Sequence, residues 1–404
     1  MRGSLPWRLS IPVYVCAFLI GVAGRAQGVV NVTDARFGAA SRTFDDPLVD
    51  DTLAFQKAID AQSAKGGGMV NVPPGIYWFN GTLTIPNNIV LSGETPGPFD
   101  PSEMTGKQDP SNTPIGAAVL VIRGVPSSEA FIRMSWYNSC VQNLFFIYAG
   151  QASLEATSPT PMAPTIRIER GAARVVGCSF MNSYVAIDVR QGRVLLHDLN
   201  IGAFAAGVVV DGAGDTVRID TVTIHPFYRI WTGRVPKNRP GKIEQWVFEN
   251  GYGIISKKVD NLQLRDVMAL SRFCGLRLEA SAQGATFGNA SGLQFDSVQY
   301  GIIASATNPG AGFFVADSYI DSSGGGPDRK SRDGIVLIHD QNHPGTSRLS
   351  FTGGLIVLNG FEHAVYVNPN SGTLETTGVT GVADGIYRYP ENASYPPPAK
   401  PALK

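Results

Sequence analysis

The segment between Pro226 and Asn250 mixes aromatic rings with cations and carboxylates, a combination that suits a sugar polymer bearing carboxylate groups. Aromatic faces stack on rings, and guanidinium or ammonium groups pair with carboxylates. Loops of this length in a compact fold are usually functional or mobile. A solvated basic loop with two packing tryptophans explains the same composition equally well. The side chains concerned are Tyr228, Arg229, Trp231, Arg234, Lys237, Arg239, Lys242, Glu244, Trp246 and Glu249.

Three tyrosines occupy equivalent places in a recurring motif and form a second candidate binding surface. Tyr184, Tyr252 and Tyr300 each directly precede the turn residue of a repeat. If the repeats stack, the rings form a row of sugar-stacking platforms along a groove. The same row would also serve as a packing ladder, and the sequence slightly favours that structural role. The three tyrosines are kept as candidate substrate-binding residues, with packing as the alternative.

The repeated motif consists of a turn position, usually glycine, followed by aliphatic strand residues. Successive turn positions are 22, 46, 22, 26, 33, 30 and 21 residues apart, so the longest step holds two repeats and other long steps hold insertions. A second series of triplets ends in Asp198, Thr221, Asp266, Ser297 and Asp317, which we interpret as structural turn residues. Two interleaved series with one period predict a β-solenoid with one repeat per coil. The turn positions are Val185, Gly207, Gly253, Gly275, Gly301, Gly334, Ala364 and Gly385.

Offsets from the turn residue predict which side chains share a face. We expect Arg272, Arg277, Tyr252 and Tyr300 to line one solvent-accessible groove near the 226–250 insertion, since equal offsets in successive coils lie about 5 Å apart. A β-sandwich would need hairpin turns instead of this single recurring coil. The residues expected to stack in the core are Val208, Ile254, Leu276, Ile302 and Ile335.

The stretch from Val29 to Glu94 predicts a cap for one end of the solenoid. A helix is expected over Leu53–Lys65, with an N-terminal cap supplied by one of the residues Asp50 to Thr52. The triple glycine Gly66–Gly68 ends this helix, and two short β-rich runs follow. Its apolar face is expected to consist of Phe55, Ala58 and Ile59.

This order of elements resembles the N-terminal segment of the pectate-lyase superfamily domain, which rhamnogalacturonase-like and epimerase-like proteins share. The chain departs from the family at Ala40–Leu48, where a compact Gly-Asp-Gly turn is usual. The resemblance implies a right-handed parallel β-helix, usually acting on polysaccharide, but it carries no reaction because the matching residues build the end cap. They are Asn31-Val32, Phe37-Gly38-Ala39, Asp50-Asp51-Thr52, Phe55-Gln56, Ala58-Ile59-Asp60, Gly67-Gly68, Val72-Pro73-Pro74-Gly75-Ile76-Tyr77 and Leu91-Ser92-Gly93-Glu94.

Known reactions on this fold leave incomplete traces in the sequence. Polygalacturonase-type hydrolases carry Asn-Thr-Asp, Asp-Asp, Gly-His-Gly and Arg-Ile-Lys motifs, none of which occurs on the predicted coils. The Asp-Pro-His-Glu motif of alginate carbon-5 epimerases is also missing. A glycosidase still needs two carboxyl groups at a fixed separation. The available candidates are Glu249, Glu279, Asp296 and Asp333.

Elimination is the other reaction for which the chain offers candidate residues. It needs a base for the α-proton of a uronate, and cations or calcium to neutralise the carboxylate. Arg272 and Arg277 lie on a central coil and are the candidate bases. Glu249 and Asp333 are candidate catalytic carboxylates, and their oxygens could also hold calcium. Salt bridges to neighbouring carboxylates explain the two arginines equally well.

Composition and the N-terminus predict a secreted protein. Equal numbers of basic and acidic residues, 33 of each among 404, give no support for nucleic acid or an anionic membrane as partner. Met1–Ala26 has the charged start, apolar run and small-residue cleavage site of a secretory signal peptide. The remaining Cys140, Cys178 and Cys274 are an odd, scattered set, which predicts buried small hydrophobes rather than disulfides or metal ligands.

These features together predict one secreted domain. Residues 1–26 are the signal peptide, 27–95 the N-terminal cap and first coils, 96–389 an all-β, single-stranded right-handed parallel β-helix, and 390–404 a Pro-rich tail. The predicted function is binding and cleavage of an acidic, pectin-like polysaccharide, by lyase or hydrolase chemistry, with calcium as a cofactor in the lyase case. The alternative is a non-catalytic carbohydrate-binding or cell-surface protein on the same fold.

Overall fold

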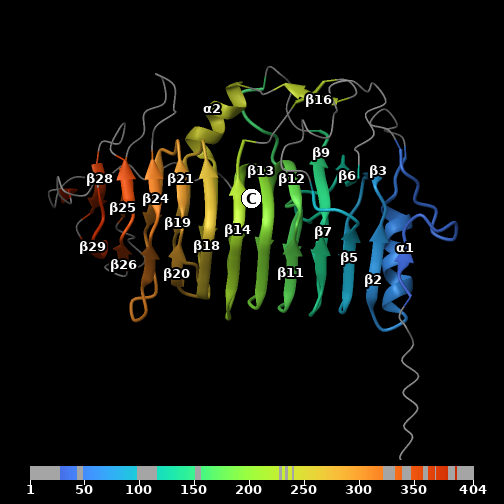
Figure 1. Ribbon diagram of the computed structural model, residues 1–404, viewed down its shortest axis with the longest axis horizontal. Coiled ribbons are helices and arrows are strands. Elements are labelled where there is room, and N and C mark those ends of the chain that lie inside the picture. Colours follow the sequence, from blue (N-terminus) through green and yellow to red (C-terminus); the bar gives the residue numbers. More distant parts are fainter. Residues whose placement is uncertain are drawn as a thin grey trace, which may run out of the picture.

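Short parallel strands follow one another around the molecule and stack along its long axis, with helix α1 (Thr52–Ser63) at the N-terminal end (Figure 1). The computed structural model describes residues 28–42, 49–97, 116–150, 156–226, 230–232, 235–238, 241–321, 333–338, 347–357, 363–368, 370–380 and 387–388. The predicted signal peptide and Pro-rich tail lie outside these residues. Each coil pairs in parallel with the coils before and after it, so the predicted right-handed parallel β-helix is confirmed.

The strands form three parallel ladders, which one coil visits in turn. The first ladder contains β1 (Val30–Asn31), β2 (Gly68–Val72), β5 (Ile89–Gly93), β8 (Cys140–Gln142), β11 (Ala173–Val176), the first parts of β13 (Val194–Val210), β14 (Val217–Ile224) and β18 (Asp260–Leu270), then β20 (Phe287–Ser291), β23 (Phe313–Ala316), β26 (Ser347–Thr352) and β29 (Gly372–Thr377).

The second ladder follows after a tight turn in most coils. It contains β3 (Gly75–Phe79), β6 (Ala118–Ile122), β9 (Leu144–Tyr148), the first part of β12 (Ser179–Val189), the middle of β13, the ends of β14 and β18, and then β21 (Gln294–Asp296), β24 (Tyr319–Asp321) and β27 (Leu355–Val357).

The third ladder completes the coil. It contains β4 (Leu83–Ile85), β7 (Ile132–Met134), β10 (Ile166–Ile168), the ends of β12 and β13, and then β17 (Tyr252–Ser256), β19 (Cys274–Leu278), β22 (Tyr300–Ala304), β25 (Asp333–Leu337), β28 (His363–Val367) and β30 (Tyr387–Arg388).

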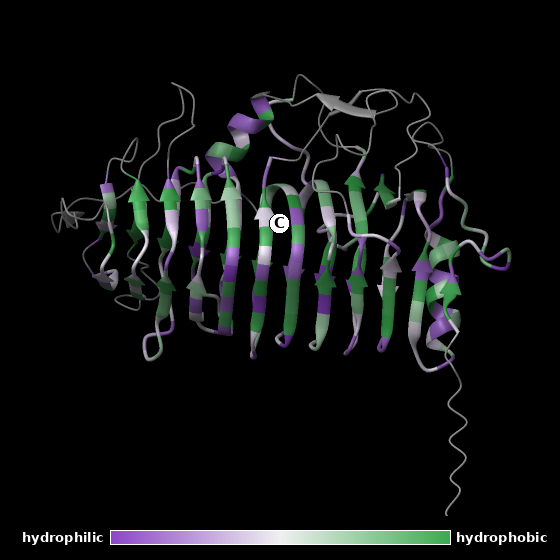
Figure 2. Cartoon of the chain, viewed as in Figure 1, coloured by the Kyte–Doolittle hydropathy of each residue, from purple (hydrophilic) through white to green (hydrophobic). Residues whose placement is uncertain are grey.

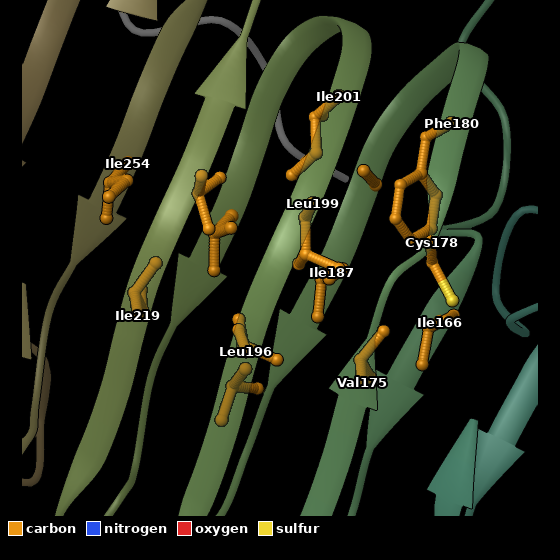
Figure 3. Close-up of a cluster of buried hydrophobic side chains, with 14 of the residues drawn as sticks. Ile166, Val175, Cys178, Phe180, Ile187, Leu196, Leu199, Ile201, Ile219 and Ile254 are labelled. Atoms are coloured by element: carbon orange, nitrogen blue, oxygen red, sulfur yellow. The ribbon is translucent and has the colours of Figure 1, made fainter. Parts of the chain in front are cut away.

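Hydrophobic side chains from all three ladders fill the interior. The predicted core residues Val208, Ile254, Leu276, Ile302 and Ile335 pair in register and are fully buried, which confirms that prediction. Figure 3 shows the same arrangement in neighbouring coils, where aliphatic side chains gather between the strands. Hydrophobic positions repeat from coil to coil along the stack (Figure 2). Full burial of each such side chain contributes about 1.5–3 kcal/mol, so the core is strengthened coil by coil.

The observed register corrects one predicted turn position of the first series. Val185 pairs with Ala206, and Ile187 pairs with Val208. Ala186, rather than Val185, therefore takes the place that Gly207 holds in the next coil. The prediction was off by one residue because a bulge between Phe180 and Val185 shifts the strand.

A second correction concerns the turn between the first and second ladders. Arg265 pairs with Ser291, so Gly292 rather than Ser297 follows the row of Asp266. The residues of this row adopt left-handed backbone angles that turn the chain sharply. Asp296 consequently belongs to the second ladder, in β21, between β18 and β24. The left-handed residues of the row include Asp198, Thr221, Asp266, Gly292 and Asp317, with φ between +48° and +65°.

Glycine is required in the recurring turn because the next coil passes very close. A Cβ placed on Gly207 would lie 2.8 Å from the carbonyl oxygen of Gly253. A Cβ on Gly275 would lie 2.5 Å from the ring of Phe295, in the interior. These contacts are shorter than carbon atoms tolerate, so the glycines in the motif reflect packing between coils.

Helix α1 covers the N-terminal end of the stack, as predicted, beside β1, β2, β4 and β5. Phe55, Ala58 and Ile59 are buried, which confirms the predicted apolar face. The capping prediction is only partly right, because the carboxylate of Asp51 accepts a hydrogen bond from the Trp78 N–H instead of from the helix. Asp50 accepts the Thr52 N–H at 3.0 Å. Neither helix among the described residues is long and apolar enough to cross a bilayer.

The three described cysteines are free thiols. Cys178 and Cys274 are buried, as predicted, and Cys140 is half-buried. Burial raises the pKa of Cys140 to about 11 and those of Cys178 and Cys274 to about 12. The protonated thiol is a poor nucleophile, so these residues have the character of packing side chains.

We expect Cys140, Cys178 and Cys274 of the folded protein to resist a thiol-specific disulfide reagent at pH 8. The raised pKa values keep all three protonated at that pH, and burial also blocks access to Cys178 and Cys274. Absorbance of the released chromophore should rise fully only after denaturant is added. Rapid labelling of Cys178 or Cys274 without denaturant would contradict the buried placement.

Candidate functional site

The long excursions of the chain leave the helix mainly at one corner, between the second and third ladders. Residues 149–165 connect β9 to β10, and residues 225–251 connect β14 to β17. The second of these contains the β15–β16 hairpin (Ile230–Thr232 and Val235–Asn238) and α2 (Gly241–Asn250). Figure 1 shows α2 and β16 along one edge of the stack. We call this edge the insertion corner.

The three predicted tyrosines lie beneath the insertion corner rather than in an open groove. Tyr184, Tyr252 and Tyr300 are 7%, 3% and 4% exposed and belong to an apolar cluster on the outer side of the helix. Phe273 packs between Tyr252 and Tyr300, with ring centroids 5.4 and 5.1 Å away. The α2 residues Ile243 and Val247 complete the cluster. The prediction of a solvent-accessible groove at these rings is therefore wrong, because α2 and its neighbours cover them.

Arg272 is fully buried at the turn between β18 and β19. Its guanidinium donates hydrogen bonds to the backbone oxygens of Leu270 and Tyr252, at 3.3 and 2.8 Å. Both acceptors lie where the chain changes ladders, so the arginine satisfies carbonyl groups that the strands leave there. This placement corrects the expectation that Arg272 lines an accessible groove.

Arg277 projects outward from β19, as predicted, but only 7% of the residue is exposed. It lies between Ile255 and Ile303 in the same row of the third ladder. Nε donates to Glu279 at 3.3 Å, which is the salt bridge predicted as the alternative role. Its buried position excludes direct contact with a polymer in this conformation, which corrects the groove prediction for this residue too.

Of the predicted carboxylates, Glu279 pairs with Arg277, whereas Glu249 and Asp333 have partners on other elements. Glu249 is exposed on α2 and accepts a hydrogen bond from Gln245 one helical turn earlier. Asp333 is 2% exposed, and its Oδ1 lies within hydrogen-bond distance, 2.8 Å, of Nδ1 of His363 on the neighbouring coil. Arg229 and the side chain of Trp231 lie outside the described residues, so their predicted substrate contacts stay predictions.

Calcium was predicted only for the lyase case. Among the described residues, no three His, Cys, Asp or Glu side chains gather in a way that could hold a metal ion. Glu249 and Asp333, the proposed oxygen ligands, have the separate partners given above.

Two aspartates on adjacent coils lie at the end of the second ladder, just before the insertion corner. Phe295 pairs with Ile320, so the following Asp296 and Asp321 are neighbours across β21 and β24. The Tyr319 hydroxyl donates a 2.7 Å hydrogen bond to Oδ2 of Asp321. This bond, followed by burial and the charges of both aspartates, raises the pKa of Tyr319 to about 12. The tyrosine therefore remains a hydrogen-bond donor at neutral pH.

Asp296 and Tyr319 are more open to solvent than Arg272 and Arg277. Tyr319 is 38% exposed, Asp296 is partly exposed, and Asp321 is 4% exposed. One carboxylate is thus sheltered while its neighbour and an aromatic ring reach solvent. Asp296 was a predicted candidate, but Tyr319 and Asp321 were missed. The signal that could have found them is the repeated pattern Phe295-Asp296 and Ile320-Asp321, which the misaligned second series concealed.

The model of the family described as "Rhamnogalacturonase A/epimerase, pectate lyase-like" matches residues 29–163. The suspected resemblance is thereby confirmed for this part of the chain. Asp296 and Asp321 lie outside the matched residues. No curated protein sequence matches the chain.

Solved structures with a similar fold share little sequence. The HK620 tailspike of an E. coli bacteriophage, in a mutant form solved with a pentasaccharide, has a TM-score of 0.56 at 11% identity, with 91% of this chain and 64% of that chain covered. The Streptococcus pneumoniae surface protein and adhesin PfbA has a TM-score of 0.55 at 11% identity, covering 89% and 99%. The Dettilon tailspike has a TM-score of 0.53 at 14% identity, covering 87% and 59%. The chain therefore spans less than two thirds of either tailspike's length, and the likeness concerns the fold.

Proposed function

We propose that this chain, which carries a pectate lyase-like segment over residues 29–163, is a secreted polysaccharide hydrolase whose catalytic pair is Asp296 and Asp321. The observation that carries the proposal is the alignment of these two carboxylates on adjacent coils beside the exposed ring of Tyr319. The predicted signal peptide at Met1–Ala26 is the basis for proposing secretion.

Hydrolysis is favoured over elimination by what each reaction needs. Elimination needs a base that reaches the sugar, and both candidate arginines are buried and bonded within the protein. Hydrolysis needs two carboxyl groups on either side of a glycosidic bond. Asp296 and Asp321 supply such a pair where an extended polymer can approach along the second ladder.

The two aspartates can be assigned complementary roles. The Tyr319 hydroxyl donates to Asp321, and a hydrogen bond to the charged form favours the carboxylate. Asp321 is therefore assigned as the nucleophile or base. Asp296 is assigned by elimination as the acid that protonates the leaving oxygen, since hydrolysis divides the two roles between two carboxyl groups. The Tyr319 ring supplies an apolar face against which a sugar can stack.

The first substrate class to test is a galacturonate-containing polymer. The matched family is named for rhamnogalacturonase activity. The chain has equal numbers of basic and acidic residues, which argues against binding driven by net charge alone. Cationic side chains of the 226–250 insertion, predicted from the sequence to pair with uronate carboxylates, agree with this class.

Non-catalytic binding is the second candidate function. The likeness to a streptococcal adhesin, which covers 99% of that chain, favours it at the level of fold. Fold alone does not decide between an enzyme and a binder, because either can be built on the same helix. The decisive difference is whether the paired aspartates perform chemistry.

A panel of pectic and neutral polysaccharides, read in two ways, tests the proposal. Reducing ends should increase on at least one polymer, while absorbance from unsaturated products should not. Unsaturated products would identify a lyase and overturn the assignment of the aspartates. Binding without either product would support the non-catalytic alternative.

A further inference from the structure

Trp136 and Tyr137 are the most exposed aromatic residues among the described part of the chain. They are 54% and 57% exposed, compared with 48% for Phe314 and 38% for Tyr319. The two are consecutive, in the turn between β7 and β8 where the third ladder gives way to the first. Exposed apolar patches rimmed by polar groups commonly mark binding sites.

The turn that carries these rings is held at both ends. Asn138 has a left-handed φ of +58°, and its Nδ2 donates to Oδ1 of Asn88 on the preceding coil at 2.9 Å. The hydroxyl of Ser135 donates to Glu169 on the following coil at 2.9 Å. The hydroxyl of Ser139 donates to the Trp136 carbonyl oxygen at 3.4 Å. Because these hydrogen bonds fix the turn to neighbouring coils, its backbone loses little conformational entropy when the rings bind a ligand.

Polar groups continue the surface along the same corner. A Cβ on Gly171 would lie 3.8 Å from Cε1 of Tyr137, so the tyrosine ring extends over the next coil. Arg193, one coil further, pairs with Asp215 at 2.8 Å, and their side chains are 72% and 44% exposed. The Asp215 hydrogen bond and charge raise the pKa of Arg193, with a smaller contribution from Tyr137. The same Cβ on Gly171 would lie 2.7 Å from the carbonyl oxygen of Gly192, the residue before Arg193, so the Tyr137 ring and Arg193 lie on successive coils of one corner.

We infer that Trp136, Tyr137, Arg193 and Asp215 form a second polysaccharide-binding site, on a different corner of the helix from the Asp296–Asp321 pair. The rings would stack on the apolar faces of pyranose units, and the charged pair would bond their hydroxyl groups. Coils spaced about 4.8 Å apart place these groups along a line, as an extended polymer requires.

The size and composition of the patch favour a sugar chain over a protein partner. A stable protein interface buries about 800 Å² on each side with a substantial apolar centre. Here two rings are bordered directly by amide and charged groups, among them Asn138 and Arg193. The inference rests on the proposed function for the identity of the polymer, but it does not depend on hydrolysis.

Affinity electrophoresis through gels containing polygalacturonic acid or rhamnogalacturonan tests this site with a W136A/Y137A double variant. Wild-type protein should be retarded by at least one of the two polymers, and the double variant should bind that polymer about tenfold or more weakly. Hydrolysis of a short soluble oligosaccharide should remain unchanged, because Trp136 and Tyr137 lie on other coils, and at another corner of the helix, than Asp296 and Asp321. Phe314→Ala, which removes another exposed ring, is the matched control and should bind like wild type.

Other outcomes separate this inference from the proposed function. Polymer binding that is lost in W136A/Y137A, in a protein without hydrolytic activity, would support the site and count against the hydrolase. Equal retardation of wild type and W136A/Y137A would overturn the site, as would no retardation of wild type by either polymer. A wild-type dimer that becomes monomeric in the double variant would show that the rings bind protein, and would overturn it as well.

Discussion

Asp321→Asn is expected to lower the hydrolytic rate by about 10²–10⁴-fold while leaving polymer binding nearly unchanged. The amide matches the carboxylate in shape but cannot act as nucleophile or base, and positioned acid–base groups contribute about this much to catalysis. The Tyr319 hydroxyl can still donate to the amide oxygen, so the local hydrogen bond survives. Initial rates of reducing-end release and affinity electrophoresis measure the two quantities separately.

Asp317→Asn is the matched control for this substitution. Asp317 lies four residues earlier on the same coil, is exposed, and has a left-handed φ of +48° that asparagine adopts readily. Its activity should equal that of wild type. Asp296→Asn provides a second test of the pair, and should also be impaired by at least 10²-fold. Full activity in either Asp296→Asn or Asp321→Asn would remove the pair from the mechanism.

The stereochemistry of the product follows from the same geometry. Neighbouring strands lie about 4.8 Å apart, which is nearer to the carboxyl separation of about 5 Å in retaining enzymes than to the wider separation in inverting ones. We therefore expect the first product to keep the anomeric configuration of the substrate. Proton NMR of the products during the first minutes of reaction distinguishes the two outcomes.

Gly275→Ala is expected to produce a large loss of stability in the central coils. The new methyl group would lie 2.5 Å from the Phe295 ring, so the ring or a whole coil must move. Overpacking of this kind costs about 1–3 kcal/mol, and more where neighbouring backbone cannot relax. Denaturant unfolding followed by tryptophan fluorescence and circular dichroism measures the shift in midpoint.

Gly124→Ala serves as the control for the glycine substitution. A Cβ at Gly124 would meet nothing within 4 Å, and its backbone does not have the left-handed angles that penalise alanine. This change should be neutral or slightly stabilising, because alanine restricts the unfolded chain. Equal midpoints for the two variants would show that contact between coils is not what places glycine at 275.

The sequence was sufficient to predict the fold because its signals are local and repeated. One glycine before each aliphatic strand, and one apolar offset after it, recur often enough to define the coil and the core row from Val208 to Ile335. The apolar face of α1 follows from residues only three and four apart. Such patterns depend on neighbours in sequence, so a single chain suffices to recognise them.

The candidate site was harder to predict because it depends on the register between strands and on which outward side chains are buried. A bulge near Val185 displaced one predicted turn position by a residue. The assignment of Ser297 to the wrong row concealed that Asp296 and Asp321 occupy equivalent places on adjacent coils. Outward direction was correctly expected for Arg277, but its neighbours Ile255, Ile303 and Glu279 leave it only 7% exposed. Neither fact is encoded in the spacing of the motif itself.

The apolar cluster beneath α2 also has a consequence for how the molecule opens. The Phe273 N–H donates to the Val247 carbonyl oxygen, and the Cys274 N–H donates to that of Gly251, so α2 is tied to β19 as well as packed on the outer face. A solenoid held only by contacts between successive coils would lose amide protection gradually from its ends. Here the coils of β13, β17 and β19 should exchange their amide protons together and last, as one cooperative unit, while the coils of β26 to β29 exchange first.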